Sequence, residues 1–224
     1  KCQGIKTRLT DWIRELTAHV ECARWIEPFA GSCAVGLNLR PKSALLCDSN
    51  PHLVHFYRSV QQGSVSPESV RRHLETEGRR LLDDGEVHYY RIRDRFNAFR
   101  DGPDGAGDPH DFLFLNRACF NGLIRFNRGG GFNVPFCRKP ARYAPAYVTR
   151  IVNQVAQARA VIGSGDWEFR CQRFEATLSE ATADDLLYCD PPYAGRHTDY
   201  FNRWTEADET TLASELVRCR APFI

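Results

Sequence analysis

Residues 24–48 read RWIEPFAGSCAVGLNLRPKSALLCD, and this stretch decides the fold. It opens with a short apolar strand candidate, residues 24–29, which runs into a turn that contains Gly31. A helix-compatible segment, 35–39, follows, and then a second apolar segment that ends on Asp48. A doubly wound α/β fold opens with this order of elements: a strand, a turn that contains glycine, a helix, and a second strand that ends on an acidic residue. We therefore predict a parallel sheet with helices on both faces.

The same α/β rhythm returns in the last third of the chain. Apolar residues at helical spacing predict a helix over 147–162, and apolar segments predict strands at 167–171 and 186–189. A last helix is expected to begin at Thr205, because Asp208 stands three residues later, as in a capping box. A first helix is predicted near the other end of the chain. Its apolar residues Leu9, Trp12, Ile13 and Leu16 have helical spacing.

Between these two parts the pattern changes, and residues 57–143 are expected to form an inserted lobe. Ser66-Pro67-Glu68 is typical of a helix start, with Ser as the cap and Pro in the first turn. A second helix is predicted with Tyr89, Ile92, Phe96 and Phe99 on one face. The predicted division is therefore a sheet domain in two halves, 1–56 and 144–224, around this lobe.

Composition indicates a globular protein, with 42% apolar and 26% charged residues. No apolar run approaches the roughly 18 residues of a membrane span and no secretory signal is visible, so we expect a cytoplasmic protein. The nine cysteines form no C-x-x-C pair, so reduced, buried thiols and no metal site are expected. Pro222-Phe223-Ile224 resembles the opening of a strand, and further C-terminal strands are expected beyond it.

The charge of the chain is unevenly distributed, although the net charge is only +2. Residues 112–150 contain no Asp or Glu, several aromatics and seven basic residues: Arg117, Arg125, Arg128, Arg138, Lys139, Arg142 and Arg150. Such a segment is suited to following a phosphate backbone, although a merely solvated basic face is the alternative.

The sharpest chemical signal is Asp190-Pro191-Pro192-Tyr193, directly after an apolar strand. Two prolines stop the strand and stiffen the turn, so the Asp190 carboxylate and the next carbonyl project in fixed directions. In open α/β sheets, ligands bind at this carboxyl edge. The two acceptors could bind an amino group on a flat heterocycle, and the aromatic ring that follows them could stack on that heterocycle. The alternative is a rigid turn with a surface Asp.

Three motifs resemble those of the Dam-type (alpha-group) N6-adenine DNA methyltransferases. Residues 190–193 match the catalytic motif, residues 27–32 are similar to the cofactor motif, and residues 120–136 are similar to the DNA-contacting segment. The order of the motifs is also that of this group, and the resemblance covers nearly the whole chain. It implies a Rossmann-like class I methyltransferase sheet with an inserted, mainly helical DNA-recognition lobe.

The resemblance also implies an activity and its partners. The expected reaction is site-specific methyl transfer from S-adenosylmethionine to N6 of adenine in double-stranded DNA, with the target base flipped out. DNA is the expected partner, and no membrane is. The resemblance also allows a further partner, a cognate restriction endonuclease that acts on the same DNA site, but it does not require one.

Roles for single residues follow from the same resemblance. The Asp190 side chain and the Pro191 carbonyl accept the two N6 hydrogens, Pro192 stiffens the turn and Tyr193 stacks on the base. The implied cofactor site comprises Lys6, Glu27, Pro28, Phe29, Gly31, Asp48, Phe174 and Asp190. An ordinary core position is the alternative for Phe174. This chain departs from the family at two positions, with Cys2 in place of Trp and Cys33 in place of a glycine.

The resemblance implies a division of labour on DNA. Phe120 and Asn121 help to flip and replace the target base, Leu123 and Arg125 read neighbouring bases, and Pro135 lines the same interface. Arg is well suited to guanine in the major groove. Arg138 and Lys139 are expected to hold phosphates. Core packing is the alternative for Leu123 and Pro135.

Two other functions compete with this one. A related enzyme could act on cytosine N4, RNA adenine or a protein amide, and a chain without catalysis could simply bind DNA. Methylation of cytosine C5 needs a cysteine nucleophile after proline, and no Pro-Cys dipeptide occurs in the chain. Intact acids at Asp48 and Asp190 argue against a silent DNA-binding module.

Overall fold

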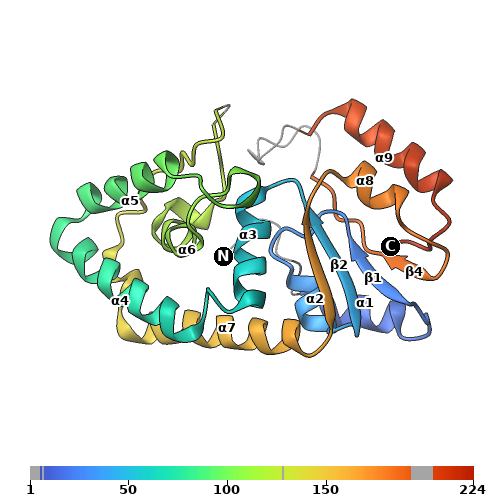
Figure 1. The fold of residues 1–224 in the computed structure, drawn as a ribbon, viewed down its shortest axis with the longest axis horizontal. Helices are drawn as coiled ribbons and strands as arrows, with labels where there is room; N and C mark the ends of the chain where they lie inside the picture. Colours follow the sequence, from blue (N-terminus) through green and yellow to red (C-terminus); the bar gives the residue numbers. More distant parts are fainter. Residues whose placement is uncertain (1–5, 7, 128, 193–203) are drawn as a thin grey trace. The chain divides into compact units, whose positions relative to one another are not determined.

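The structure, a computed structural model, describes residues 6, 8–127, 129–192 and 204–224. The chain divides into two compact units, one mainly helical and one built around a sheet (Figure 1). The helical unit is built from Pro51–Ala160. The sheet unit is built from the described residues up to Asn50 together with Val161–Ile224. In the described part of the chain, no helix is both long and apolar enough to cross a bilayer.

A four-stranded parallel sheet forms the centre of the sheet unit. Its strands are β1 (Arg24–Glu27), β2 (Ser43–Asp48), β3 (Asp166–Cys171) and β4 (Asp185–Leu187), in the order β3-β2-β1-β4. Ile26 of β1 is in register with Leu45 of β2 and with Leu187 of β4. The mixed α/β class and the predicted parallel sheet are thus confirmed. Because all four strands run the same way, their carboxyl ends lie along one edge.

Helices cover both faces of this sheet. On one face Ile26, Leu45 and Leu187 form a buried cluster with residues of α8 (Phe174–Ser179) and α9 (Glu206–Arg218). Alternate strand residues point to the other face. There α2 (Ala34–Leu39) approaches so closely that a Cβ on Gly36 would lie 3.0 Å from the Glu27 Oε1 atom. The short α8 had no counterpart in the sequence prediction, whereas the Thr205–Asp208 capping box of α9 is present as predicted.

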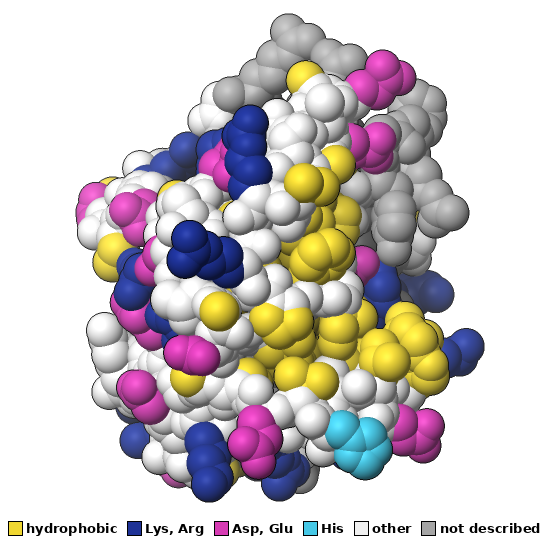
Figure 2. All heavy atoms as spheres, turned by 90° about the vertical axis from the view of Figure 1, so that its right-hand side faces the viewer, with side chains coloured by type: hydrophobic (Ala, Val, Ile, Leu, Met, Phe, Trp, Pro, Cys, Tyr) yellow, Lys and Arg dark blue, Asp and Glu magenta, His cyan; other side chains and the backbone are white. Residues whose placement is uncertain are grey.

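The helix predicted near the start of the chain is α1 (Thr10–Thr17), but its apolar side chains are mostly uncovered. Ile13 is buried, while Trp12 is 56% exposed and Leu16 is 49% exposed. Phe223, which pairs in parallel with Leu187 of β4, is also exposed. Figure 2 shows hydrophobic side chains gathered on the face of the molecule that it presents. Helical spacing therefore identified the element without identifying what it packs against.

The helical unit consists mainly of five helices in the part of the chain that the structure describes. These are α3 (Pro51–Gln62), α4 (Pro67–Asp84), α5 (Glu86–Ala98), α6 (Pro109–Ala118) and most of α7 (Pro145–Gly163). Ser66 caps α4 in a capping box with Ser69, as the Ser-Pro-Glu start predicted. The sequence pattern predicted neither α3 nor α6. The prediction that Phe99 shares one helix face with Tyr89 and Phe96 was wrong, because α5 ends at Ala98 and the Phe99 side chain is 63% exposed.

A buried ionic network joins α4, α5 and α6. Arg95 of α5 donates two hydrogen bonds to the Asp111 carboxylate of α6, at 2.7 and 2.5 Å. His73 Nε2 of α4 lies 3.3 Å from the same carboxylate, and His88 Nε2 lies 2.8 Å from Glu77. Burial alone would raise the pKa of Asp111, but the bonds from His73 and Arg95 leave it below its usual value. The network holds three helices in one arrangement, because an unpaired buried charge is costly.

Glu27 is a buried carboxyl that braces β1 against α2. Its Oε1 atom accepts from the Trp25 indole at 2.8 Å and from the Gly36 N–H at 2.7 Å. Burial nevertheless raises the pKa of Glu27 from its ordinary value of 4.5 to about 7. Since the pKa of this group is higher in the folded than in the unfolded chain, stability falls as the pH rises from about 4.5 to about 7.

Replacing Glu27 by Gln keeps an acceptor for both bonds and removes the titration. Between pH 5 and pH 8 the parent protein should lose on the order of 1–3 kcal/mol more unfolding free energy than Glu27→Gln. Urea unfolding at the two pH values measures this difference. Glu21→Gln, at an exposed position just before β1, is the control and should follow the parent. Equal losses in the parent and in Glu27→Gln would contradict the prediction.

Candidate active site and nucleic-acid interface

The carboxyl ends of β1, β2 and β4 place the predicted cofactor and catalytic motifs along one edge of the sheet unit. Asp48 is the last residue of β2. After β4 the backbone stays tied to the sheet, because the Tyr188 N–H donates to the Ile26 carbonyl and the Cys189 N–H to the Ile224 carbonyl, both at 2.8 Å. Asp190 directly follows this anchored backbone.

Asp48 connects the two loops at this edge. Its Oδ2 atom accepts from the Gly31 N–H and its Oδ1 atom accepts from the Asn50 N–H, both at 2.8 Å. Burial raises the pKa of Asp48, although both backbone hydrogen bonds act to lower it. Asp48 thus joins the turn after β1 to the end of β2.

The turn after β1 depends on left-handed backbone at two positions. Gly31 has φ +49°, and among the described residues no atom other than those of its two chain neighbours lies within 4 Å of the position that a Cβ would occupy there. Cys33 also has positive φ, at 50°. This conformation is costly for a residue with a Cβ, which gives a physical reason for the glycine that the family has at the position of Cys33. Cys33 is buried, and the eight cysteines that the structure describes are free thiols.

Asp190 forms an ion pair with Lys6, whose Nζ lies 2.8 Å from the Asp190 Oδ2 atom. Both side chains keep about a fifth of their surface exposed, so the pair lies at the rim rather than in the core. Pro191 and Pro192 follow, both half-buried. Tyr193, the fourth residue of the motif, lies outside the described residues.

The remaining residues of the implied cofactor site lie deeper. Glu27 and Pro28 are buried beneath the turn, and the Glu27 carboxyl is engaged with Trp25 and Gly36. The Phe174 ring is only 4% exposed and stands 5.4 Å from the ring of Phe29. Phe174 belongs to the core cluster, in agreement with the alternative that it is an ordinary core residue.

Trp204 completes this aromatic group and was not singled out from the sequence. Its ring centroid lies 5.5 Å from the rings of both Phe29 and Phe174. The available signal was an aromatic residue one position before the capping residue of α9, which is too common a pattern to be specific.

In the helical unit, two segments run antiparallel and bring the predicted DNA-contacting residues together. The Phe120 N–H donates to the Pro135 carbonyl at 2.8 Å, and Cys119 pairs with Phe136. Phe120 is 51% exposed, and Asn121 is exposed with φ 53°. Pro135 is also exposed, so it is not a core residue, whereas Leu123 is half-buried.

The three basic residues of the predicted interface differ in their surroundings. Arg125 is half-buried and bonded to Asn133 by Nε at 2.7 Å and by Nη2 at 3.2 Å. Arg138 and Lys139 are exposed. Sequence reasoning counted Arg142 as part of the basic stretch without giving it a task. Its Nη1 donates to two carbonyls ahead of the Phe120 turn, those of Arg117 and Cys119, both at 3.2 Å.

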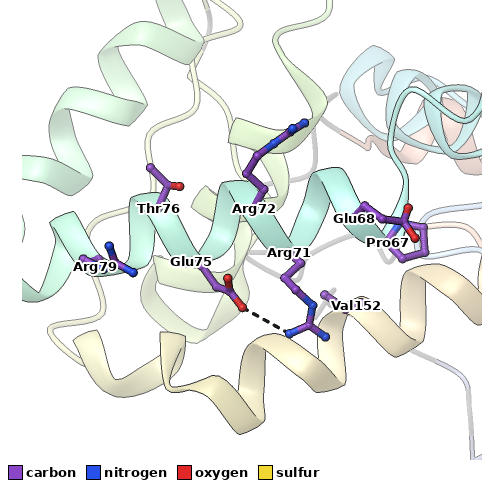
Figure 3. A pocket seen from close by; sticks show the side chains of 8 residues that line it. All are labelled: Pro67, Glu68, Arg71, Arg72, Glu75, Thr76, Arg79 and Val152. Carbon is purple, nitrogen blue, oxygen red and sulfur yellow. Dashed lines mark hydrogen bonds and ion pairs between the residues drawn. The ribbon is translucent and has the colours of Figure 1, made fainter.

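A separate surface pocket of about 490 Å³ lies between α4 and α7 of the helical unit (Figure 3). Its charged lining mixes both signs: Glu68, Arg71, Arg72, Glu75 and Arg79. Arg71 is paired with Glu75 at 3.3 Å. None of the residues predicted from the motifs lines this pocket, so it is not the candidate active site.

Comparison with known proteins decides the family. Residues 3–222 match the family model described as D12 class N6 adenine-specific DNA methyltransferase. The chain belongs to this family. The D12 methyltransferase is thus an adenine-specific DNA methyltransferase, and S-adenosylmethionine is its cofactor. Membership decides against cytosine N4, RNA adenine and a protein amide as targets, and it confirms the resemblance on which the site residues were named.

Curated relatives agree with this assignment. This chain is 36% identical over 221 residues to the retron Ec67 DNA adenine methylase of Escherichia coli. The aligned residues cover 96% of this chain and 70% of the relative. The chain is 33% identical over 209 residues to a DNA adenine methylase of Vibrio cholerae, covering 90% and 70%. With a DNA adenine methylase of Salmonella typhi the identity is 31% over 236 residues, covering 100% and 78%.

Removing the Asp48 carboxylate tests the cofactor half of the site. Asp48→Ala should weaken binding of S-adenosylhomocysteine by about 1.5–3 kcal/mol, the typical value of a hydrogen bond to a charged group. Isothermal calorimetry measures this change. Asp166→Ala is the matched control, because Asp166 is an exposed acid at the opposite, amino end of neighbouring β3. Unchanged affinity in Asp48→Ala would remove this residue from the site.

Proposed function

We propose that the D12 methyltransferase methylates N6 of adenine within a specific sequence of double-stranded DNA, after turning the target base out of the helix. The observation that carries this proposal is Asp190, which follows strand backbone anchored up to Cys189 and is paired with Lys6 at 2.8 Å. An amino group inside a stacked duplex cannot reach a clamp of this kind, so the base has to leave the stack.

The proposed domain roles follow the two units. The sheet unit is a Rossmann-like class I methyltransferase domain, supported by its all-parallel sheet with helices on both faces. Residues 57–143 form the target-recognition lobe within the helical unit. That unit extends further, over Pro51–Ala160, because α3 and most of α7 pack with it.

The residues at the sheet edge fit S-adenosylmethionine. Asp48 offers a carboxylate of the kind that accepts from ribose hydroxyls, and Gly31, with φ +49°, lets the backbone of its turn approach the cofactor without a side chain. Lys6 and Asp190 offer both signs of charge, as the amino-acid end of the cofactor requires. Phe29 would contribute an aromatic wall, while Glu27, Pro28 and Phe174 would support the site from below. When bound, S-adenosylmethionine supplies an electrophilic methyl group.

The catalytic task of the protein is to orient the adenine amino group. N6 is a poor nucleophile because its lone pair is delocalised into the ring. The Asp190 carboxylate and the Pro191 carbonyl would accept the two N6 hydrogens and so direct the lone pair towards the methyl group. Positioning and electrostatics suffice, without a covalent intermediate. Lys6 would keep the Asp190 carboxylate in a fixed orientation, and Tyr193 would stack on the base.

The proposed DNA contacts come from the helical unit. Phe120 and Asn121 would take the place of the flipped base, which their exposure supports. Leu123, Arg125 and Pro135 would face neighbouring bases. Arg138 and Lys139, both exposed, would hold phosphates.

Asp190→Ala tests the catalytic role. The variant loses the acceptor that orients N6, so its rate of methyl transfer should fall at least about a hundredfold, as when one preorganised partner of a transition state is removed. DNA affinity should change far less. Tritium-methyl transfer to duplex DNA and a binding titration measure the two effects. Asp184→Ala, an exposed acid just ahead of the same strand, is the control. Activity of Asp190→Ala within tenfold of the parent would refute the role.

Arg125→Ala and Lys139→Ala together test the DNA contacts. A base contact is worth about 1–3 kcal/mol at one position, so Arg125→Ala should relax the preferred site at one base pair. A phosphate contact acts on every sequence, so Lys139→Ala should keep the preference and lower the salt slope of binding by about one unit. Methylation of a randomised duplex library decides between them. If Arg125→Ala weakens all sites in proportion, Arg125 is a phosphate contact.

A further inference from the structure

Asn133 binds one edge of the Arg125 guanidinium group through two hydrogen bonds. The Nε atom donates to the Asn133 side-chain oxygen at 2.7 Å, and Nη2 donates to the Asn133 backbone carbonyl at 3.2 Å. The Asn133 N–H in turn donates to the Arg125 carbonyl at 3.2 Å. These bonds join two positions that face each other across the hairpin closed by the Phe126–Phe132 pair.

Asn133 is itself anchored on both sides by α5. The Phe132 N–H donates to the Asn97 side-chain oxygen at 2.8 Å, and the Asn97 amide donates back to the Phe132 carbonyl at 3.1 Å. The Tyr89 hydroxyl donates to the Val134 carbonyl at 2.6 Å. Phe132 and Val134 are also buried, at 1% and 0% exposure. Asn133 therefore stands on a short segment whose two neighbours are fixed to a helix.

We propose that Asn133 is a specificity-determining residue, which aims Arg125 at the base that Arg125 reads. This inference rests on the base-reading role proposed above. An arginine side chain loses rotamer freedom when it binds, and holding it before DNA arrives removes part of that cost. Holding the Nε–Nη2 edge also sets the direction of the Nη1–Nη2 end, which can make the two-bonded contact with O6 and N7 of guanine.

Substitutions at Asn133 separate aiming from folding. Asn133→Ala removes the side-chain acceptor and should reduce the preference at one base pair about three- to tenfold, at the same base pair as Arg125→Ala. Asn133→Asp keeps an acceptor oxygen and should restore the preference, while its negative charge lowers affinity for all sequences equally. Methylation of a randomised duplex library measures the preference. Thermal unfolding and S-adenosylhomocysteine affinity, measured on the same proteins, should stay close to the parent values.

Asn127 is the matched control in the same hairpin. Its side-chain oxygen accepts from the Gly131 N–H at 2.9 Å and braces the turn. Asn127→Ala should lower methylation of all sites in proportion and leave the preference unchanged. If Asn133→Ala behaves in the same way, the aiming role is overturned while that of Arg125 stands. If Arg125→Ala leaves the preference intact, base reading fails and the aiming role fails with it. Should Asn133→Ala not fold, Asn133→Ser serves the same comparison.

Discussion

The pairing of β1 with β2 on one side and with β4 on the other is the constraint on which the sheet unit depends. Ile26 is in register with both Leu45 and Leu187, so segments far apart in the chain end at one edge. Pro28 follows β1 directly, and the prolines at 191 and 192 come shortly after β4, so neither segment continues as a regular strand. The polar groups of both segments thus lie where a parallel sheet exposes the ends of its strands.

Two interactions convert this edge into a site. The bonds from the Gly31 and Asn50 amides to Asp48 join two loops through one carboxylate, and the Lys6–Asp190 pair holds the proposed catalytic carboxylate at the rim. Each unit contains a buried carboxyl group, and the two groups differ in how their burial is compensated. Glu27 has a raised pKa, whereas Asp111 is paired with Arg95 and His73 and has a lowered one.

The helical unit holds its irregular segments by side chains rather than by a sheet. Asn97 and Tyr89 fix the backbone around Asn133, and Arg142 binds carbonyls ahead of Phe120. Loops so held can present side chains with little loss of freedom on binding. This matters for a protein that has to distinguish bases, because discrimination depends on the direction of each donor.

The sequence by itself determined the sheet, most of the helices and the motifs, since strand and helix periodicity, proline stops and capping residues are local signals. It missed α3, α6 and α8. It also placed Phe99 on one helix face with residues that the structure buries, because burial depends on what packs against a helix. Only the tertiary structure decided that Phe174 lies in the core with Trp204 and that Glu27 braces Gly36. The hydrogen bonds between Arg125 and Asn133 could not be predicted from the sequence either, because bonds across a hairpin depend on its register. That register is set by the anchoring of Phe132 and Val134 to α5.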